Sequence, residues 1–310
     1  MGKYVKKVAF LVLVLLLFVA VLFLVQKEKD TASHLPKITV STFALYDIVK
    51  HVGGNNIDVE MVIPFGVEVH SFEPTPKTII EIQKSRLFLY CGADLEPWVS
   101  NLAQGENLRD MSRYVHLIEP DEVSDEEEHH HHHHNAVDPH YWLDVDNMKL
   151  LVKKIASEFM LIDPQNSALY QQRAEVYIQE LTDLDEAYTK RLQHCKIRTV
   201  VLHHNILGYV AAKYTFSVEP LTGLSPDALA DAQTMAALSK TIREKGIKVL
   251  FFEAFVSDRM MQSLASENGI EIDYLEPLAN ITASQAKAQM SYVEGMETNL
   301  EKLARAMGCE

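Results

Sequence analysis

Residues 164–192 read PQNSALYQQRAEVYIQELTDLDEAYTKRL, and this stretch decides how the chain of 310 residues is organised. Its apolar and aromatic side chains recur at helical spacing and form one stripe: Tyr170, Ala174, Tyr177, Leu181, Leu184, Tyr188 and Leu192. Pro164 begins the stretch, and proline is well tolerated in the first turn of a helix. At about 1.5 Å per residue, a helix of this length extends about 43 Å, which exceeds the width of a single small lobe. We therefore predict that residues 164–193 form a rigid helix that joins two lobes.

On both sides of this helix, short apolar strands alternate with amphipathic helices. Before it, the predicted strands are KITVST (37–42), IDVEMVI (57–63), RLFLYC (86–91) and YVHLI (114–118), and the predicted helices cover 44–54, 74–84 and 147–162. After it, the strands are RTVVLH (198–203), IKVLFFEAF (247–255) and IEIDYL (270–275), and the helices cover 205–214, 226–246, 258–269 and 282–307. Strands separated by short helices imply βα units and mostly parallel sheets. We expect an α/β protein with an N-terminal lobe (34–163) and a C-terminal lobe (194–310).

The N-terminal segment, residues 1–33, is an export signal in character. MGKYVKK (1–7) carries three lysines, and VAFLVLVLLLFVAVLFLV (8–25) is apolar throughout and just long enough to span a bilayer. It is either a signal peptide or an uncleaved anchor. Both place the remaining chain in the periplasm or on the extracytoplasmic face of the membrane.

The charge and the cysteines narrow the function classes. Without residues 1–33 the chain has 24 basic and 41 acidic residues, so it repels nucleic acid and suits a protein that handles cations. The chain has three cysteines and no CxxC, which excludes a cysteine zinc site. Cys195 and Cys309 could pair, whereas Cys91 lies in an apolar run and is expected to be buried.

Histidines stand where predicted strands pass into loops. His70 follows one strand, His140 lies in the turn DPH (138–140), and His203 and His204 end the strand RTVVLH. The carboxyl ends of parallel strands meet at a ligand crevice, and three imidazoles with one oxygen ligand make a tetrahedral zinc site. Manganese and magnesium sites use more carboxylate, and the usual nucleotide, hydrolase and zincin motifs are absent. Zinc is therefore the expected ion.

The segment 119–137 breaks the α/β pattern, because it is polar and offers no core residue. Six consecutive histidines follow the acidic run Asp125–Glu128, and they are His129, His130, His131, His132, His133 and His134. Such a segment is expected to be a solvated, disordered loop. Neutral imidazoles bind cations and the acidic run concentrates them, so we expect the loop to be a second zinc-binding region of lower affinity.

Five segments resemble a known family: GVEVHSFEPTPKTI, LYCGADLEPWV, DPHYWLD, HHNILGYVAAKYTF and GIKVLFFEAF. They are similar, in order and over residues 37–310, to the metal-binding solute receptors of ABC importers of the ZnuA/TroA type. The resemblance implies a receptor without catalytic activity that captures a divalent cation between two lobes and delivers it to a membrane permease. A His- and acid-rich segment just before D-P-H is also typical of the zinc receptors in that family.

The resemblance also implies the ligands. His70 and His140 match the first two family histidines, and the third stands five residues before an aromatic, which selects His204 (before Tyr209) and not His203. Manganese receptors of the family are expected to have glutamate at the third place, so histidine there points to zinc.

The fourth ligand position stays open at this point. It falls near Glu276 in YLEPLAN, but zinc receptors of the family often leave it to water, and Glu68 is an alternative. Glu253, at the end of VLFFE, is expected to be a hydrogen-bonded carboxylate beside the ligands.

Three other functions are compatible with these residues. A manganese or iron(II) receptor has the same fold, but His204 and the histidine loop argue against it. A zinc metallohydrolase would need Glu68 or Glu276 as its general base. A surface adhesin would use the fold for another purpose, and the sequence is silent on it.

Overall fold

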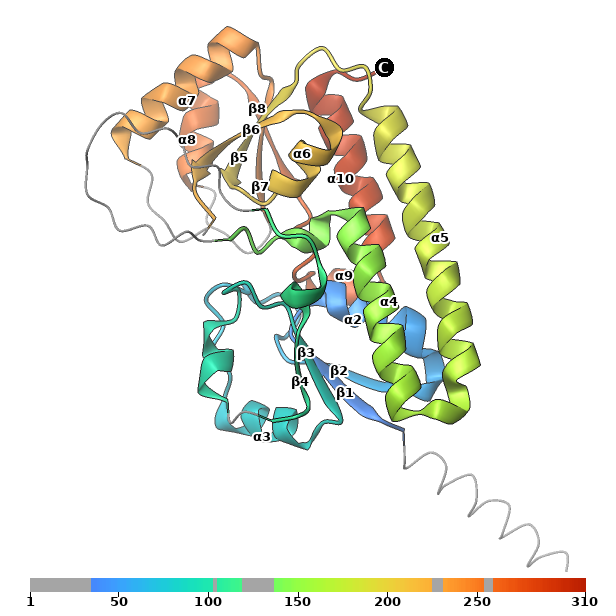
Figure 1. Ribbon diagram of the computed structural model, residues 1–310. Coiled ribbons are helices and arrows are strands. Elements are labelled where there is room, and N and C mark those ends of the chain that lie inside the picture. Colours follow the sequence, from blue (N-terminus) through green and yellow to red (C-terminus); the bar gives the residue numbers. More distant parts are fainter. Residues whose placement is uncertain (1–34, 103–104, 119–136, 225–230, 254–258) are drawn as a thin grey trace, which may run out of the picture.

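The computed structural model describes residues 35–102, 105–118, 137–224, 231–253 and 259–310 (Figure 1). The predicted signal or anchor and the six consecutive histidines lie outside the described residues. In the part of the chain that is described, no helix has the length and apolar character needed to cross a bilayer.

Each lobe contains one four-stranded, wholly parallel sheet. The N-terminal sheet has the order β2-β1-β3-β4, with β1 (Lys37–Val40), β2 (Asp58–Met61), β3 (Leu87–Tyr90) and β4 (Leu108–Asp110). The C-terminal sheet has the order β6-β5-β7-β8, with β5 (Thr199–His204), β6 (Ser217–Thr222), β7 (Val249–Glu253) and β8 (Glu271–Leu275). The strand order reverses beside the first strand of each sheet, and ligands bind at the carboxyl ends of such strands. The prediction of an α/β fold is confirmed. In each lobe, the carboxyl ends of the strands are the expected place for a ligand.

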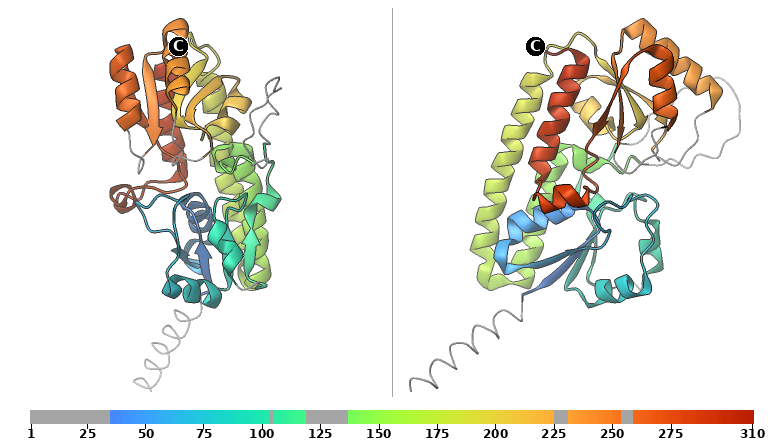
Figure 2. Two further views of the ribbon diagram at one scale, coloured as in Figure 1. Left: turned by 90° about the vertical axis from the view of Figure 1, so that its left-hand side faces the viewer. Right: turned by 180° about the vertical axis from the view of Figure 1, so that it is seen from behind.

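The helices cover the sheets and join the lobes. They are α2 (Phe43–Gly53), α3 (Pro76–Lys84), α4 (Val145–Ile162), α5 (Ser167–Arg191), α6 (Gly208–Tyr214), α7 (Ala232–Lys245), α8 (Arg259–Asn268), α9 (Ala283–Lys287) and α10 (Tyr292–Met307). Helix α5 runs along both lobes, beside α2 and α4 of the N-terminal lobe and beside α10 of the C-terminal lobe (Figures 1 and 2).

The predicted stripe of α5 is buried, and its tyrosines bond to both lobes. The Tyr177 hydroxyl donates to Asp47 Oδ2 in α2 at 2.5 Å. The Tyr188 hydroxyl donates to the carbonyl oxygen of Met296 in α10 at 2.7 Å. Because the stripe packs on both lobes, α5 is the rigid connection that its sequence predicts.

A second connection passes from the C-terminal lobe back to the N-terminal lobe after β8. The Phe43 N–H donates to the Ala279 carbonyl at 2.7 Å, and Asn280 Nδ2 donates to the carbonyls of Pro64 and Val67, both at 2.8 Å. One hydrophobic cluster contains buried side chains of both lobes and of α5. With two connections and a shared core, the lobes have little freedom for a wide hinge motion.

The structure corrects the prediction of a strand at 114–118. The fourth strand of the N-terminal sheet is β4, and YVHLI follows it as a short 3-10 turn and an irregular segment. The backbone of His116 bonds to the side chain of Asn147, with N–H to Oδ1 at 2.8 Å and Nδ2 to the carbonyl at 2.9 Å. A side-chain amide thus satisfies the groups that a neighbouring strand would satisfy.

The predicted terminal helix 282–307 is also corrected, because it is divided into α9 and α10. Gln289 has a φ of 58°, a left-handed conformation that ends a helix. Ser291 then begins α10, because its side chain accepts from the Glu294 N–H while the Glu294 carboxylate accepts from the Ser291 N–H.

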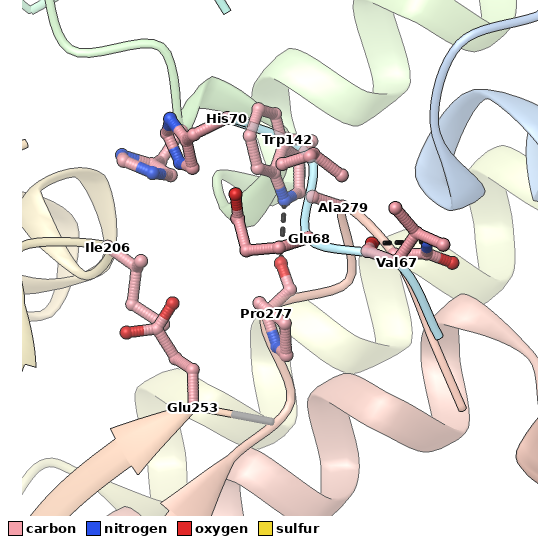
Figure 3. A pocket seen from close by; sticks show the side chains of 11 residues that line it. Val67, Glu68, His70, Trp142, Ile206, Glu253, Pro277 and Ala279 are labelled. Carbon is pink, nitrogen blue, oxygen red and sulfur yellow. Dashed lines mark hydrogen bonds between the residues drawn. The ribbon is translucent and has the colours of Figure 1, made fainter. Parts of the chain in front are cut away.

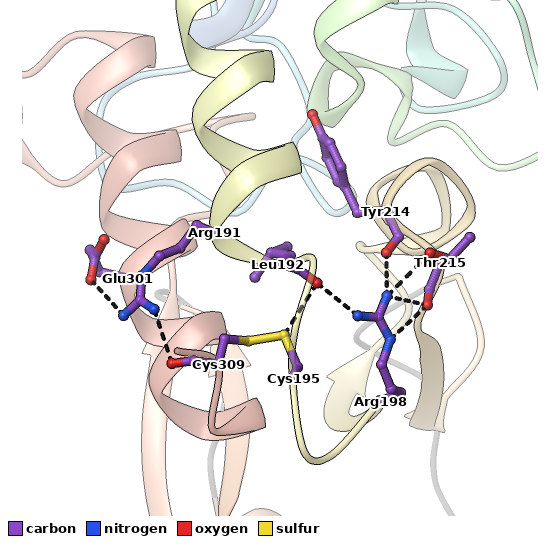
Figure 4. Close-up of a disulfide and its surroundings, with 8 residues drawn as sticks. All are labelled: Arg191, Leu192, Cys195, Arg198, Tyr214, Thr215, Glu301 and Cys309. Atoms are coloured by element: carbon purple, nitrogen blue, oxygen red, sulfur yellow. Dashed lines mark hydrogen bonds and ion pairs between the residues drawn. A yellow bond between two sulfur atoms is a disulfide. The ribbon is translucent and has the colours of Figure 1, made fainter.

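Cys195 and Cys309 form a disulfide that joins the end of α10 to the turn after α5 (Figure 4). Arg191 Nη1 donates to the Cys309 carbonyl at 3.0 Å beside it. Cys91 is buried and free, as its apolar context predicts.

Candidate metal centre

Three predicted histidines converge from the two lobes. His70 lies in the loop between β2 and α3, His140 precedes the 3-10 turn Tyr141–Leu143, and His204 is the last residue of β5. One nitrogen of each ring lies within 4.8 Å of the others, and the Nε2 atoms of His140 and His204 are 3.3 Å apart. The group therefore lies between the lobes, at the carboxyl ends of the sheets.

The direction of β5 separates His204 from its neighbour. Successive side chains of a strand point to opposite faces, so the rings of His203 and His204 leave β5 in different directions. His203 is absent from the group with His70 and His140, and it belongs instead to a second group with His204 and Glu253. The two groups share His204.

A small cavity adjoins the histidines. Its volume is about 20 Å³, room for a single water-sized occupant. Glu68, His70, His140, Trp142 and Glu253 are among the residues that line it, and Figure 3 shows Glu68, His70 and Glu253 around the same opening. Glu68 is held in its loop, because its Oε2 accepts from the Ser71 N–H at 3.0 Å.

Two of the three rings have a carboxylate at Nδ1. Asp138 Oδ1 lies 2.8 Å from His140 Nδ1, and Glu253 Oε1 lies 2.7 Å from His204 Nδ1. A carboxylate at one ring nitrogen fixes the orientation of the ring and leaves the other nitrogen for a metal. Glu253 thus lies beside a predicted ligand, as expected. This role of Asp138 is not predicted from the sequence, where its only signal is its place two residues before His140 in the turn.

The surroundings of His70 favour the neutral imidazole, the form that binds metals. His140 and His204 are 2% and 1% exposed. Burial, and after it the proximity of His140 and His204, lowers the pKa of His70 to about 3. Burial raises the pKa of Glu253 to about 8. A proton is therefore costly to hold on His70, and its lone pairs stay available to a cation at neutral pH.

The structure does not bring Glu276 into this group. It is buried, and its Oε1 accepts from Gln285 Nε2 at 2.7 Å. Its backbone N–H donates to Asn299 Oδ1 at 2.8 Å, and Asn299 Nδ2 donates to its carbonyl at 2.8 Å. Three of the four predicted ligands are thus together, and the role of Glu276 stays a prediction, as does that of the histidines at 129–134, which lie outside the described residues.

Three imidazoles around a water-sized space suit a four-coordinate ion of borderline softness, with one position left for an oxygen donor. The residues therefore fit zinc.

Known proteins show the same combination of fold and sequence. A sequence profile of the family described as "ZnuA: Zinc-uptake complex component A periplasmic" matches residues 38–306. The high-affinity zinc uptake system protein ZnuA of Bacillus subtilis (strain 168) is 33% identical over 273 residues, which are 86% of this chain and 86% of that protein. The zinc-binding protein AdcA of Streptococcus pyogenes serotype M3 is 30% identical over 296 residues, which are 90% of this chain but only 58% of AdcA.

A solved structure agrees with the profile. The crystal structure of the Zn(II)-bound ZnuA-like domain of Streptococcus pneumoniae AdcA has a TM-score of 0.73 and 28% identity to this chain, covering 88% of it and 99% of that domain. The match of the profile extends through both lobes and includes His70, His140 and His204. This chain therefore belongs to the ZnuA family of periplasmic zinc-uptake components.

Proposed function

We propose that this protein is an extracytoplasmic zinc receptor that binds Zn(II) between its lobes and delivers it to an ABC-type permease in the membrane. The observation that carries the proposal is the convergence of His70, His140 and His204 from both lobes. The relatives named as zinc-uptake and zinc-binding proteins support it. The apolar stretch 8–25 and the periplasmic description of the family support the location.

In this proposal the three imidazoles bind the ion, and water or Glu68 supplies the fourth donor. Glu68 is favoured over Glu276 as a protein donor because it lines the cavity beside His70 and His140, whereas Glu276 is engaged with Gln285. Zinc is favoured over manganese and iron(II) because all three grouped donors are nitrogens.

The receptor releases its ion unchanged, so we infer that it is not an enzyme. The relatives' names describe uptake and binding, which favours a receptor over the metallohydrolase alternative. The two connections between the lobes and their shared core predict limited rocking on binding.

Equilibrium competition among Zn, Mn, Fe and Cu on the purified chain tests the proposal. Zinc should occupy one tight site from which equimolar manganese cannot displace it, and the His70→Ala/His140→Ala double variant should lose that site. The proposal fails if manganese competes equally, or if the double variant binds zinc as tightly as the parent.

A further inference from the structure

We propose that Asp138 is a positioning residue that fixes the orientation of His140 for the incoming ion. Tyr209 of the other lobe holds the backbone of Asp138, and Gly208 leaves room for its carboxylate. The inference rests on the proposed function. It adds that the orientation of a ligand from the N-terminal lobe depends on the first turn of α6, the helix that follows the ligand strand β5.

Asp138 contacts both the ring and the backbone of His140. Its Oδ1 lies 2.8 Å from His140 Nδ1 and also accepts from the His140 backbone N–H at 2.9 Å. Both residues are almost fully buried, with 4% and 2% of their surfaces exposed. The ring is therefore locked with Nε2 toward His204, the neighbour 3.3 Å away. Without the carboxylate, the ring could rotate and Nδ1 would lose its partner.

The backbone of Asp138 is in turn held by Tyr209. The Tyr209 hydroxyl donates to the Asp138 carbonyl at 2.8 Å and accepts from the Ile118 N–H at 3.0 Å. The Asp138 N–H also donates to the Ile118 carbonyl at 3.2 Å. One buried hydroxyl of the C-terminal lobe thus binds two segments of the N-terminal lobe that meet at Asp138.

Gly208 gives the carboxylate room beside α6. A Cβ atom at position 208 would lie 2.5 Å from Asp138 Oδ2, closer than real Cβ contacts allow. A side chain there would push the carboxylate away from the helix, and with it the oxygen that holds His140. Glycine is therefore required by this close approach.

These contacts relate His140 to His204 through a short path. Tyr209 lies in α6, five residues after His204 at the end of β5. Its hydroxyl fixes the position of Asp138, and Asp138 fixes the orientation of the His140 ring. The Tyr209–Asp138 hydrogen bond between the lobes thus helps to position two ligands that come from different lobes.

The test compares two tyrosines of α6. Tyr209→Phe removes one oxygen and no volume, and Tyr214→Phe is the matched control, because the Tyr214 hydroxyl donates to Asp185 at 2.7 Å and not to Asp138. Zinc affinity of the full chain is measured by competition with a chromophoric chelator. The visible spectrum of the Co(II)-loaded protein reports ligand geometry, and urea unfolding reports stability separately.

We expect Tyr209→Phe and Asp138→Asn to weaken zinc binding by about 10- to 100-fold and to shift the Co(II) bands, the effect usual for partners of ligating histidines. Asp138→Ala should weaken binding more than Asp138→Asn, because the amide oxygen of Asn still accepts from the ring. Tyr214→Phe should bind zinc and cobalt like the parent, although it also loses the hydrogen bond of its hydroxyl.

The inference is overturned if Tyr209→Phe and Asp138→Asn match Tyr214→Phe in affinity and in spectrum. His140→Ala separates this failure from failure of the proposed function. If His140→Ala abolishes tight binding while the Asp138 and Tyr209 variants bind normally, the receptor stands and only the positioning role is lost. Should Asp138→Ala fail to fold, the Tyr209→Phe comparison still decides, because that change leaves the packing intact.

Discussion

Replacing His203 and His204 singly by alanine compares two adjacent histidines that face opposite sides of one strand. Both are buried, at 2% and 1% exposure, at the end of β5. Each replacement removes the same imidazole from the interior, so the loss of packing is of the same kind. Only His204 is grouped with His70 and His140, and only His204 has the Glu253 carboxylate at its Nδ1.

The magnitude follows from the number of donors. Loss of a residue that only supports a ligand costs about 10- to 100-fold in metal affinity, and loss of a donor from a four-coordinate site should cost more. His204→Ala should therefore weaken zinc binding by more than about 100-fold, which corresponds to about 2.7 kcal/mol. His203→Ala should stay within about 10-fold of the parent, because its ring contributes no donor to the centre.

The assay is competition for zinc with a chromophoric chelator of known affinity. It is done with chains that lack residues 125–134, so that the loop histidines do not take up zinc in the same range. Urea unfolding of the metal-free variants shows whether both fold equally well. The reasoning is refuted if His203→Ala loses tight binding while His204→Ala keeps it, since β5 would then present the other face to the ion.

Three further predictions concern the loop, the His51–Asp47 pair and the disulfide. Deleting residues 125–134 should remove weak zinc binding and leave the tightest Kd nearly unchanged, and calorimetric titration would contradict this by showing loss of the tight site. Burial lowers the pKa of His51, but its hydrogen bond to Asp47 and the charge of Asp47 outweigh burial and raise that pKa to about 9. A pKa raised on folding adds stability that is complete below about pH 6.5 and is lost as pH rises through 9. Urea unfolding at pH 6.5 and 9.5 should therefore show a fall in the unfolding free energy of the parent that His51→Gln lacks. The Cys195→Ser/Cys309→Ser variant opens a loop with a sequence separation of 114, and it should lose up to about 4–5 kcal/mol of unfolding free energy. Its zinc affinity should be retained, and an unchanged urea midpoint would contradict the prediction.

Much of the fold follows from local periodicity. The stripe on residues 170–192 predicts the long helix, and the apolar runs before and after it predict six of the eight described strands, enough to indicate two parallel sheets. The strands β4 and β6 are not among those predicted. The strand predicted at 114–118 is wrong because Asn147, far along the chain, supplies the hydrogen bonds that a local pattern assigns to a neighbouring strand. The division of the last helix depends on one left-handed residue, Gln289, which has no strong sequence signal.

The residues of the candidate centre that stand in sequence motifs could be predicted. The contacts between segments distant in the sequence could not. His70, His140 and His204 stand in quotable motifs, and the structure groups them. The contact between Gly208 and Asp138 joins residues 70 positions apart, and its signal is only a glycine at the start of a helix. Such partners depend on how two lobes meet, which a single sequence does not display.

The most direct test is X-ray absorption of the chain that lacks residues 125–134, loaded with one equivalent of zinc. We expect a four-coordinate ion with three imidazole nitrogens at about 2.0–2.1 Å and one oxygen donor. His204→Ala should reduce the imidazole count, whereas His203→Ala should not. A parent spectrum with fewer than three imidazoles, or with six oxygen-rich ligands, would contradict the claim that the histidines from the two lobes bind the ion together.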